Sequence, residues 1–250
     1  MRRVEVLSCA PGFRRTVAEM GLAMLMAAGR GLVAEHEAFR AGNEHWLDDM
    51  EGRDFTLFGQ TIGFVGYGNI GKELHRLLQP FGPVVRVFDP WLKILPKSVG
   101  PCELTELFQK SRAVVETAVP TAENRNLVGA AQIGAMRSGS ALILLSRAHV
   151  VDFDAACRAA AGKPITFATD VFPSEPVDSL RRLPNVIWTV HRAAAATGGR
   201  HLIGEMILYD IAAIIEGDGT RQLLRADPNR VATMIAAQKQ IEDDGPFENT

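Results

Sequence analysis

The sequence predicts a doubly wound α/β fold, in which helices cover both faces of a parallel sheet. Two observations lead to this prediction. Short apolar segments of strand length alternate with segments of helical periodicity through the middle of the chain. A turn with the pattern G-x-G-x-x-G joins the first of these strands to the helix after it. The length of 250 residues has room for one large domain or two small ones.

Composition excludes several classes of protein. Apolar residues make up 47% of the chain and charged residues 22%, which is typical of a folded globular protein and not of a disordered or collagen-like chain. The 27 basic and 29 acidic residues give a net charge of −2. We therefore expect neither nucleic acid nor an anionic membrane as a partner.

No targeting or membrane segment is recognisable. The longest strongly apolar run, Leu22–Ala28, is too short to span a bilayer, and the N-terminus lacks a signal-peptide core. Cys9, Cys102 and Cys157 are widely spaced, which indicates reduced thiols and no zinc site. A cytoplasmic protein without a metal ion is the expectation. His36 and His45 would lie on opposite faces of a helix and could not share a metal.

The N-terminal part predicts one long helix and a connector. Apolar residues recur at helical spacing over residues 13–40, interrupted by glycines that could bend the helix. Residues 41–59 are polar and rich in turn formers, as in an extended connector.

The sheet is predicted to begin at Thr61–Val65, which the glycine turn connects to a helix over residues 72–78 and a second strand over 84–88. Further strands are expected at 113–118, 141–145, 165–169 and 186–190, with helices at 104–110 and 152–161. A last long helix is predicted over 199–216, followed by a short one near 229–238 and an acidic tail.

The glycine turn predicts a site for a dinucleotide. Gly66, Gly68 and Gly71 would provide a tight turn, a close backbone approach to a pyrophosphate and close packing of helix on sheet. The free amides of Asn69 and Ile70 at the helix start would face the phosphates. By itself such a motif often marks only a glycine-rich turn, and its position between strand and helix favours the functional interpretation.

A carboxylate selects between the two nicotinamide dinucleotides. Asp89 follows the second strand, 18 residues after Gly71, where a dinucleotide fold holds the ribose hydroxyls of adenosine. A 2′-phosphate would meet a like charge there, so the sequence favours NAD over NADP.

Three polar side chains follow later strands. Arg147, Glu175 and His191 would meet at the carboxyl edge of the sheet, where ligands bind in this fold. An arginine could clamp a substrate carboxylate, a histidine could move a proton, and a glutamate could orient the imidazole. Each of the three also has an ordinary structural explanation when taken alone. Together they suit hydride transfer on a small 2-hydroxy or 2-keto acid.

Four motifs carry a resemblance to a known family. The segments GQTIGFVGYGNIGKELHRLLQPFG with VRVFDP, LILLSRAHVVD, ATDVFPSEP and LPNVIWTVHRAAA occur in order. They resemble the Rossmann-type NAD-binding domain of the D-isomer-specific 2-hydroxyacid dehydrogenases. The resemblance implies that Arg147, Glu175 and His191 are catalytic. It also implies cofactor contacts from Gly66, Gly68, Asn69, Ile70, Gly71, Asp89, Val119, Leu145, Ser146, Arg147, Asp170, His191, Ala193 and Ala194. Asp170 would hold the nicotinamide carboxamide.

The sequence departs from the family in places. Ala148 stands for the usual glycine and Val190 for the usual proline, and Arg192 follows the histidine, which bears on substrate choice. Family members also carry a substrate domain of roughly 100 residues before the long helix. We therefore expect residues 1–12 to be a remnant of that domain, 13–195 to be the NAD-binding domain and 196–250 to be C-terminal helices and a tail.

This organisation leaves two functions open. The first is an NAD-dependent oxidoreductase that interconverts a small D-2-hydroxy acid and its 2-keto acid, impaired in this short chain for want of a water-excluding lid. The second is a non-catalytic NAD-binding interaction module of the same fold. In family members the long helix helps to form a dimer, so a homodimer through residues 13–59 is expected.

Overall fold

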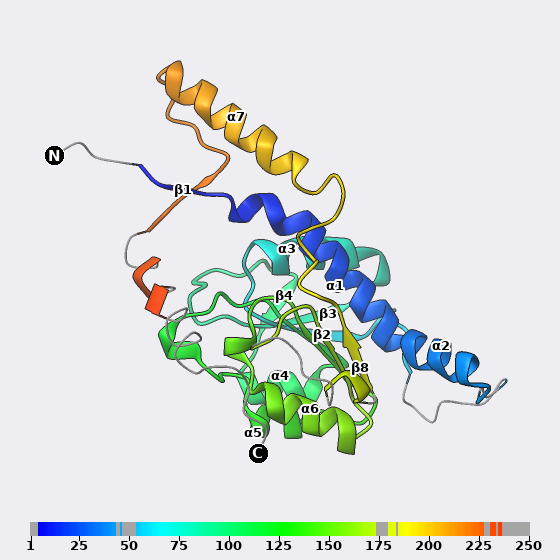
Figure 1. Ribbon diagram of the computed structural model, residues 1–250. Coiled ribbons are helices and arrows are strands. Elements are labelled where there is room, and N and C mark those ends of the chain that lie inside the picture. Colours follow the sequence, from blue (N-terminus) through cyan, green and yellow to red (C-terminus); the bar gives the residue numbers. More distant parts are fainter. Residues whose placement is uncertain are drawn as a thin grey trace.

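The predicted doubly wound α/β fold is confirmed in a computed structural model, which describes residues 5–43, 46, 54–173, 180–183, 185–227, 231–233 and 235–236. Seven parallel strands form the main sheet in the order β4-β3-β2-β5-β6-β7-β8 (Figure 1). Their bounds are β2 (Thr61–Val65), β3 (Val84–Phe88), β4 (Val99–Pro101), β5 (Ala113–Glu116), β6 (Ala141–Leu144), β7 (Thr166–Thr169) and β8 (Val186–Trp188). The helices are α1 (Arg14–Gly29), α2 (Leu32–Ala41), α3 (Asn69–Leu78), α4 (Leu104–Lys110), α5 (Ala130–Gly134), α6 (Phe153–Gly162) and α7 (His201–Ile215).

The strand order changes direction between β2 and β5. From β2 the chain adds β3 and β4 on one side, then returns to add β5, β6, β7 and β8 on the other side. The last residue of β2, Val65, lies opposite Glu116 at the end of β5. In open sheets of this type ligands bind beyond the carboxyl ends of the strands at such a switch point. The topology therefore defines one edge as the candidate ligand site.

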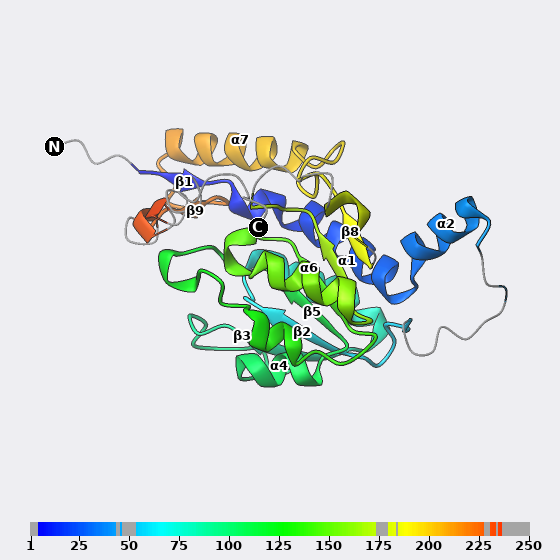
Figure 2. The same ribbon diagram turned by 60° about the horizontal axis from the view of Figure 1, so that its bottom comes forward.

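Two hydrophobic cores, one on each face, hold the sheet between its helices. In β6, Ile143 packs with α1 and α3, whereas Leu142 and Leu144 pack with α4, α5 and α6. Figure 2 shows α4 and α6 on the face of the sheet opposite α1. Because successive strand residues point to opposite faces, a strand that is covered on both sides must be apolar throughout.

The expected long helix is two helices. Between α1 and α2 the chain bends by 56° at Gly31, whose φ of 60° is left-handed and ends the first helix. The end of the connector returns close to this bend, since the Phe55 amide donates to the Gly29 carbonyl at 2.6 Å. Within the described residues no single helix has the length and apolar content of a membrane span, although residues 10–29 and 32–41 meet that criterion as a bent pair.

Several boundaries differ from those expected. The strand predicted over 113–118 ends at Glu116, because the Ala118 amide leaves the sheet and donates to the Glu116 carboxyl at 2.8 Å. Strand β4 and helix α5 were not predicted, since both are too short to show a hydrophobic period. The helix expected near 229–238 and the acidic tail lie largely outside the described residues.

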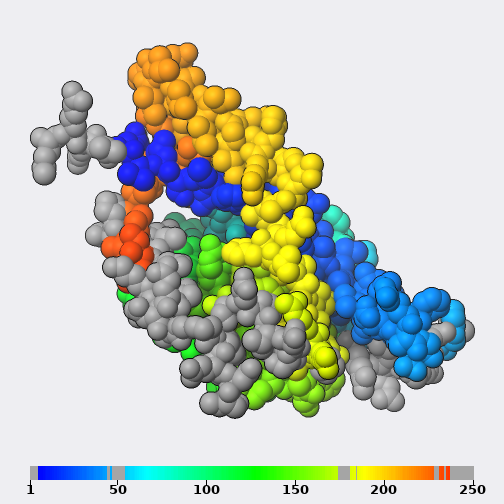
Figure 3. Space-filling model, viewed as in Figure 1, coloured from blue at the N-terminus to red at the C-terminus, as the bar shows by residue number. Residues whose placement is uncertain are grey.

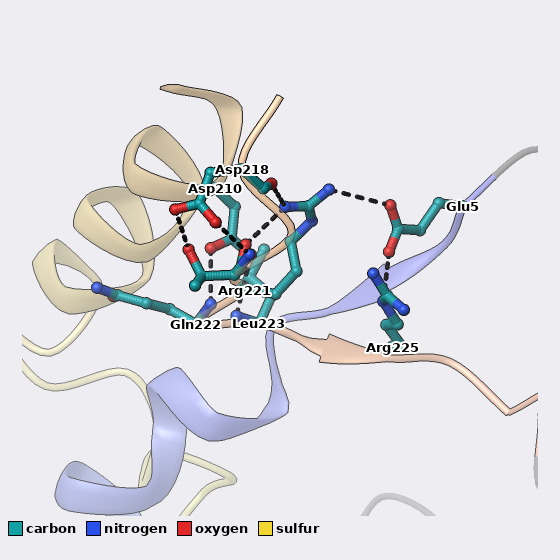
Figure 4. Close-up of polar contacts among 8 residues, drawn as sticks. Glu5, Asp210, Asp218, Arg221, Gln222, Leu223 and Arg225 are labelled. Carbon is teal, nitrogen blue, oxygen red and sulfur yellow. Dashed lines mark hydrogen bonds and ion pairs between the residues drawn. The ribbon is translucent and has the colours of Figure 1, made fainter. Parts of the chain in front are cut away.

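The two ends of the described chain meet away from the main sheet. Strand β1 (Leu7–Ser8) pairs antiparallel with β9 (Leu224–Arg225). Figure 4 shows the polar contacts that accompany this pairing: Glu5 forms ion pairs with Arg225 at 2.6 Å and Arg221 at 3.4 Å. Asp210 of α7 is buried and accepts from the Gln222 and Leu223 amides. The segment after α7 is thereby fixed beside the start of the chain.

Candidate functional site

The glycine turn follows β2 and is tied to both neighbouring strands. Gly66 has a φ of 80°, and a Cβ atom there would lie 2.5 Å from the Cα of Ala118, so only glycine fits. Its amide donates to Phe88 O at 2.9 Å, and its carbonyl accepts from the Thr117 hydroxyl at 2.8 Å. The backbone of this turn is therefore fixed on either side.

The other two glycines serve different purposes. A Cβ atom on Gly68 would have no atom of the described residues within 4 Å, which leaves the backbone open to a ligand. A Cβ atom on Gly71 would lie 3.0 Å from the Gly66 carbonyl, so this glycine is needed for packing. Helix α3 begins at Asn69, and the first amides of a helix have no partner inside it. The open backbone and these amides form a cradle that fits a pyrophosphate.

Asp89 lies directly beside the turn. Its Oδ2 accepts from the Tyr67 amide at 2.8 Å, and its Oδ1 accepts from the Trp91 amide at 3.1 Å. These bonds hold the carboxylate at the end of β3, next to the glycine backbone. A carboxylate has about four acceptor positions, so it retains capacity for the hydroxyls of a ribose.

Arg147 follows β6 on the same edge. Its backbone is extended, and its Nη1 donates to the carbonyl of Ser146 at 2.7 Å. Leu145 and Ser146 are buried just before it. Val119 follows β5, and its carbonyl accepts from the Asn124 side chain at 2.9 Å. Within the part of the chain that the structure describes, the Arg147 guanidinium has no other partner, so its remaining donors could bind an anion.

Asp170 and His191 are linked through the backbone. The buried Asp170 carboxylate accepts from Thr189 Oγ1 at 2.5 Å, from the Arg192 amide at 2.8 Å and from the Ala193 amide at 2.8 Å. These donors flank His191, which is exposed and has a left-handed φ of 53°. Asp170 therefore fixes the loop that carries the histidine, a contact that the sequence alone did not predict.

The candidate residues fall on one edge with one exception. The glycine turn, Arg147 and His191 follow β2, β6 and β8, which are parallel members of one sheet. Ala193 is buried and Ala194 is partly buried beyond the histidine. Glu175 lies outside the described residues.

In Figure 3 the surface is hollowed between the dark blue and orange segments near β1 and β9 and the green part of the sheet domain.

Sequence reasoning missed one ionisable residue at this edge. Glu116 at the end of β5 is fully buried, and its carboxyl bonds the Ser146 hydroxyl and the Ala118 amide. Burial raises the pKa of Glu116 to about 8, although these hydrogen bonds oppose the rise. The signal in the sequence was a single acidic residue that ends an otherwise apolar strand.

The described residues contain no group of three or more histidine, cysteine, aspartate or glutamate side chains positioned to hold a metal ion. The cradle at the glycine turn is built from backbone and carboxylate groups that suit a nucleotide.

A doubly wound parallel sheet with this glycine cradle and a carboxylate after the second strand defines a dinucleotide-binding domain. Residues 22–193 match the family model described as "D-isomer specific 2-hydroxyacid dehydrogenase, NAD binding domain", and the chain belongs to that family. NAD is the cofactor of this domain, and the residues of the cradle fit it.

Known proteins of this family are similar to the chain. The D-3-phosphoglycerate dehydrogenase of Escherichia coli K12 is 30% identical over 92% of this chain and 62% of its own length. The glyoxylate reductase of Korarchaeum cryptofilum is 30% identical over 81% of the chain and 64% of its own length. A phosphoglycerate oxidoreductase from Rhizobium etli has a similar structure, with a TM-score of 0.75, 36% identity and coverage of 86% of this chain and 71% of its own. The chain thus spans less than two thirds of the length of each of these two curated relatives.

Proposed function

We propose that the chain is the cofactor-binding and catalytic part of an NAD-dependent oxidoreductase that interconverts a small D-2-hydroxy acid and its 2-keto acid. The observation that carries this proposal is the common edge shared by the glycine cradle, Arg147 and His191. The names of the relatives, which include phosphoglycerate, glyoxylate and lactate enzymes, support the class of substrate.

The cradle residues would hold the cofactor. The amides at the start of α3 and the open backbone at Gly68 would bind the pyrophosphate, and Asp89 would bind the adenosine ribose. Bound NAD supplies hydride transfer. Asp170 has three of its acceptor positions filled by the loop of His191, which leaves about one for the carboxamide of the nicotinamide.

Two side chains would act on the substrate. Arg147 would bind the substrate carboxylate and the carbonyl oxygen through its remaining guanidinium donors. His191 would take the hydroxyl proton during oxidation and return it during reduction. Glu175 would orient the imidazole through a hydrogen bond to its other nitrogen. Asp170 would support this role, because it bonds the Thr189 hydroxyl before His191 and the Arg192 amide after it.

The test separates binding from chemistry. NADH binding would be measured by fluorescence titration, and oxidation of NADH would then be followed with pyruvate, glyoxylate and hydroxypyruvate. His191→Gln should retain NADH affinity and lower any turnover by about 10²–10⁴-fold, as expected for loss of a general acid. Turnover that is unchanged in this variant would refute the assignment.

The same measurement addresses the alternative. NADH binding without oxidation of any of the three acids would favour a non-catalytic NAD-binding module over an enzyme. A slow rate from the 250-residue chain alone is expected, because the part of the relatives that it does not match would face the nicotinamide and exclude water.

We also propose a cytoplasmic homodimer. Cys9, Cys102 and Cys157 are free thiols, which supports a reducing compartment. Helix α2 has no buried residue, and its large apolar side chains Leu32 and Phe39 are each 62% exposed. Apolar side chains of this size on an unburied helix support an interface within residues 13–59.

A further inference from the structure

Glu116 occupies the switch point of the sheet. It ends β5, and its neighbours in register are Val65, which precedes the glycine turn, and Leu144, which lies two residues before Ser146. The carboxyl group is therefore located between the cofactor cradle and the segment that carries Arg147. It is fully buried at the position where ligands bind in sheets of this type.

The hydrogen bonds of Glu116 connect it to this segment. One carboxyl oxygen accepts from the Ala118 amide at 2.8 Å, and the other is bonded to the hydroxyl of Ser146. Ser146 is 8% exposed, and its carbonyl accepts from Arg147 Nη1 at 2.7 Å. The three residues form a continuous chain of contacts from the buried carboxyl to the guanidinium.

Among the described residues, no charged group compensates a Glu116 carboxylate. Burial raises the pKa of Glu116, the hydrogen bonds from Ser146 and Ala118 oppose the rise, and no other charged group contributes to the shift. The charged and titratable groups on the surrounding elements are bonded to other partners: Asp89 to the Tyr67 amide, Tyr67 to His75, His149 to the Thr121 carbonyl, Arg147 to the Ser146 carbonyl, and Asp170 to the loop after β8. A buried carboxyl without a cationic partner is stable as the neutral acid.

The protonation state decides which way the Ser146 hydroxyl points. A neutral Glu116 can donate its own proton to Ser146 Oγ, which leaves the hydroxyl proton of Ser146 for another acceptor. An ionised Glu116 can only accept, so the hydroxyl proton must then turn toward it.

We propose that Glu116 is a proton-carrying positioning residue, which as a neutral acid releases the Ser146 hydroxyl to donate to the bound dinucleotide and on ionisation withdraws it. This inference rests on the proposed cofactor site at this edge. Affinity for the dinucleotide then depends on the proton of Glu116 through the Ser146 hydroxyl.

The experiment is a titration of NADH binding by fluorescence from about pH 6.5 to 9.5, a range that brackets the pKa of Glu116. The wild-type affinity should fall as pH rises, by up to about tenfold per pH unit above that pKa. Glu116→Gln carries a permanent donor toward Ser146, so its affinity should vary little over this range. Ser146→Ala should bind more weakly at low pH and lose most of the pH dependence. Glu123→Gln, an exposed acid on a neighbouring turn, should follow the wild type.

The outcomes are distinct. A pH dependence that is the same in wild type and Glu116→Gln, or one that persists in Ser146→Ala, would overturn the inference while leaving the cofactor site intact. If NADH binds at no pH, the proposed function itself fails and this inference with it. Infrared spectra give a second measurement: the band of a protonated carboxylic acid should be present in the folded wild type at neutral pH and absent from Glu116→Gln. Its absence from the wild type would also overturn the inference.

Discussion

Asp170 illustrates how one buried carboxylate can determine the geometry of a functional loop. The backbone at His191 is left-handed, a conformation that costs a residue other than glycine about 1 kcal/mol or more. Asp170 offsets this cost by accepting from donors both before and after the histidine, at Thr189 and at the amides of Arg192 and Ala193. The strain is therefore maintained by bonds that converge on a single side chain.

Replacing Asp170 should lower the stability of the protein. Asp170→Ala leaves two backbone amides without their acceptor, so the free energy of unfolding should fall by about 1–3 kcal/mol for each amide that stays buried. Urea unfolding followed by circular dichroism measures this loss. Thr189→Val removes only the hydroxyl donor and serves as the milder control, with an expected loss of about 1 kcal/mol. Equal stability of Asp170→Ala and the wild type would contradict the role of this carboxylate.

Glu116 makes a separate prediction about stability. Its pKa is about 8 in the folded protein against 4.5 for an exposed glutamate, so between these values the folded state binds more protons than the unfolded chain. The free energy of unfolding contributed by this group is greatest below pH 4.5 and is lost as pH rises toward 8, by about 1.4 kcal/mol per pH unit. Glu116→Gln removes this slope. Urea unfolding at two pH values within this window should show that the free energy of unfolding of the variant rises relative to that of the wild type at the higher pH. An equal difference between the two proteins at both pH values would refute the shift.

Among the elements, the turn between β2 and α3 contains one glycine that packing requires, Gly66, and one that we propose binds the cofactor, Gly68. Gly66→Ala should destabilise the protein strongly. The new methyl group would collide with the backbone of Ala118, and the alanine would have to adopt an unfavourable positive φ. The new methyl group of Gly68→Ala would meet no atom of the described residues, so the free energy of unfolding should change by less than about 1 kcal/mol. NADH affinity should fall at least tenfold. Thermal unfolding and NADH fluorescence report the two effects. A stable Gly68→Ala that binds NADH normally would argue against the cradle.

Elements with a clear period could be predicted from the sequence, and those defined by tertiary contacts could not. The strands Thr61–Val65 and Val84–Phe88 match their predicted bounds, because apolar residues and flanking turn signals define them locally. The break at Gly31 was not predicted as two helices, since apolar periodicity continues across it. Short β4 and α5 depend on neighbours for their stability and carry no period of their own.

The same distinction applies to the candidate site. Gly66 and Asp89 could be identified because motif spacing alone determines their positions relative to a strand and a helix. The bonds from Asp170 to the loop after β8 could not, because they join residues 19 to 23 positions apart through the three-dimensional arrangement of two strands. Glu116 was overlooked because its neighbours along the chain indicate only a buried strand.

At the scale of the whole molecule, the chain consists of the sheet domain and a set of elements packed beside it. Helix α7 and the pair β1–β9 lie outside the main sheet and are joined by Asp210 and the ion pairs of Glu5. Several apolar residues of α7 are exposed, among them Leu208 at 68% and Ile215 at 80%. Exposed apolar side chains are thus found both on α2 and on α7, and a mutational comparison can test which of them forms the proposed dimer interface.

The proposed homodimer through residues 13–59 predicts different effects for these two surfaces. In a twofold interface each substitution acts twice, and burial of one phenylalanine contributes about 1.5–3 kcal/mol. Phe39→Asp on α2 should therefore weaken the dimer by more than a hundredfold, as measured by sedimentation equilibrium over a range of concentrations. Ile215→Asp is a matched control, because it introduces the same charge at an exposed apolar position of α7 outside the proposed interface. A wild-type chain that stays monomeric at every concentration would contradict the dimer, and dissociation by Ile215→Asp in place of Phe39→Asp would move the interface from α2 to α7.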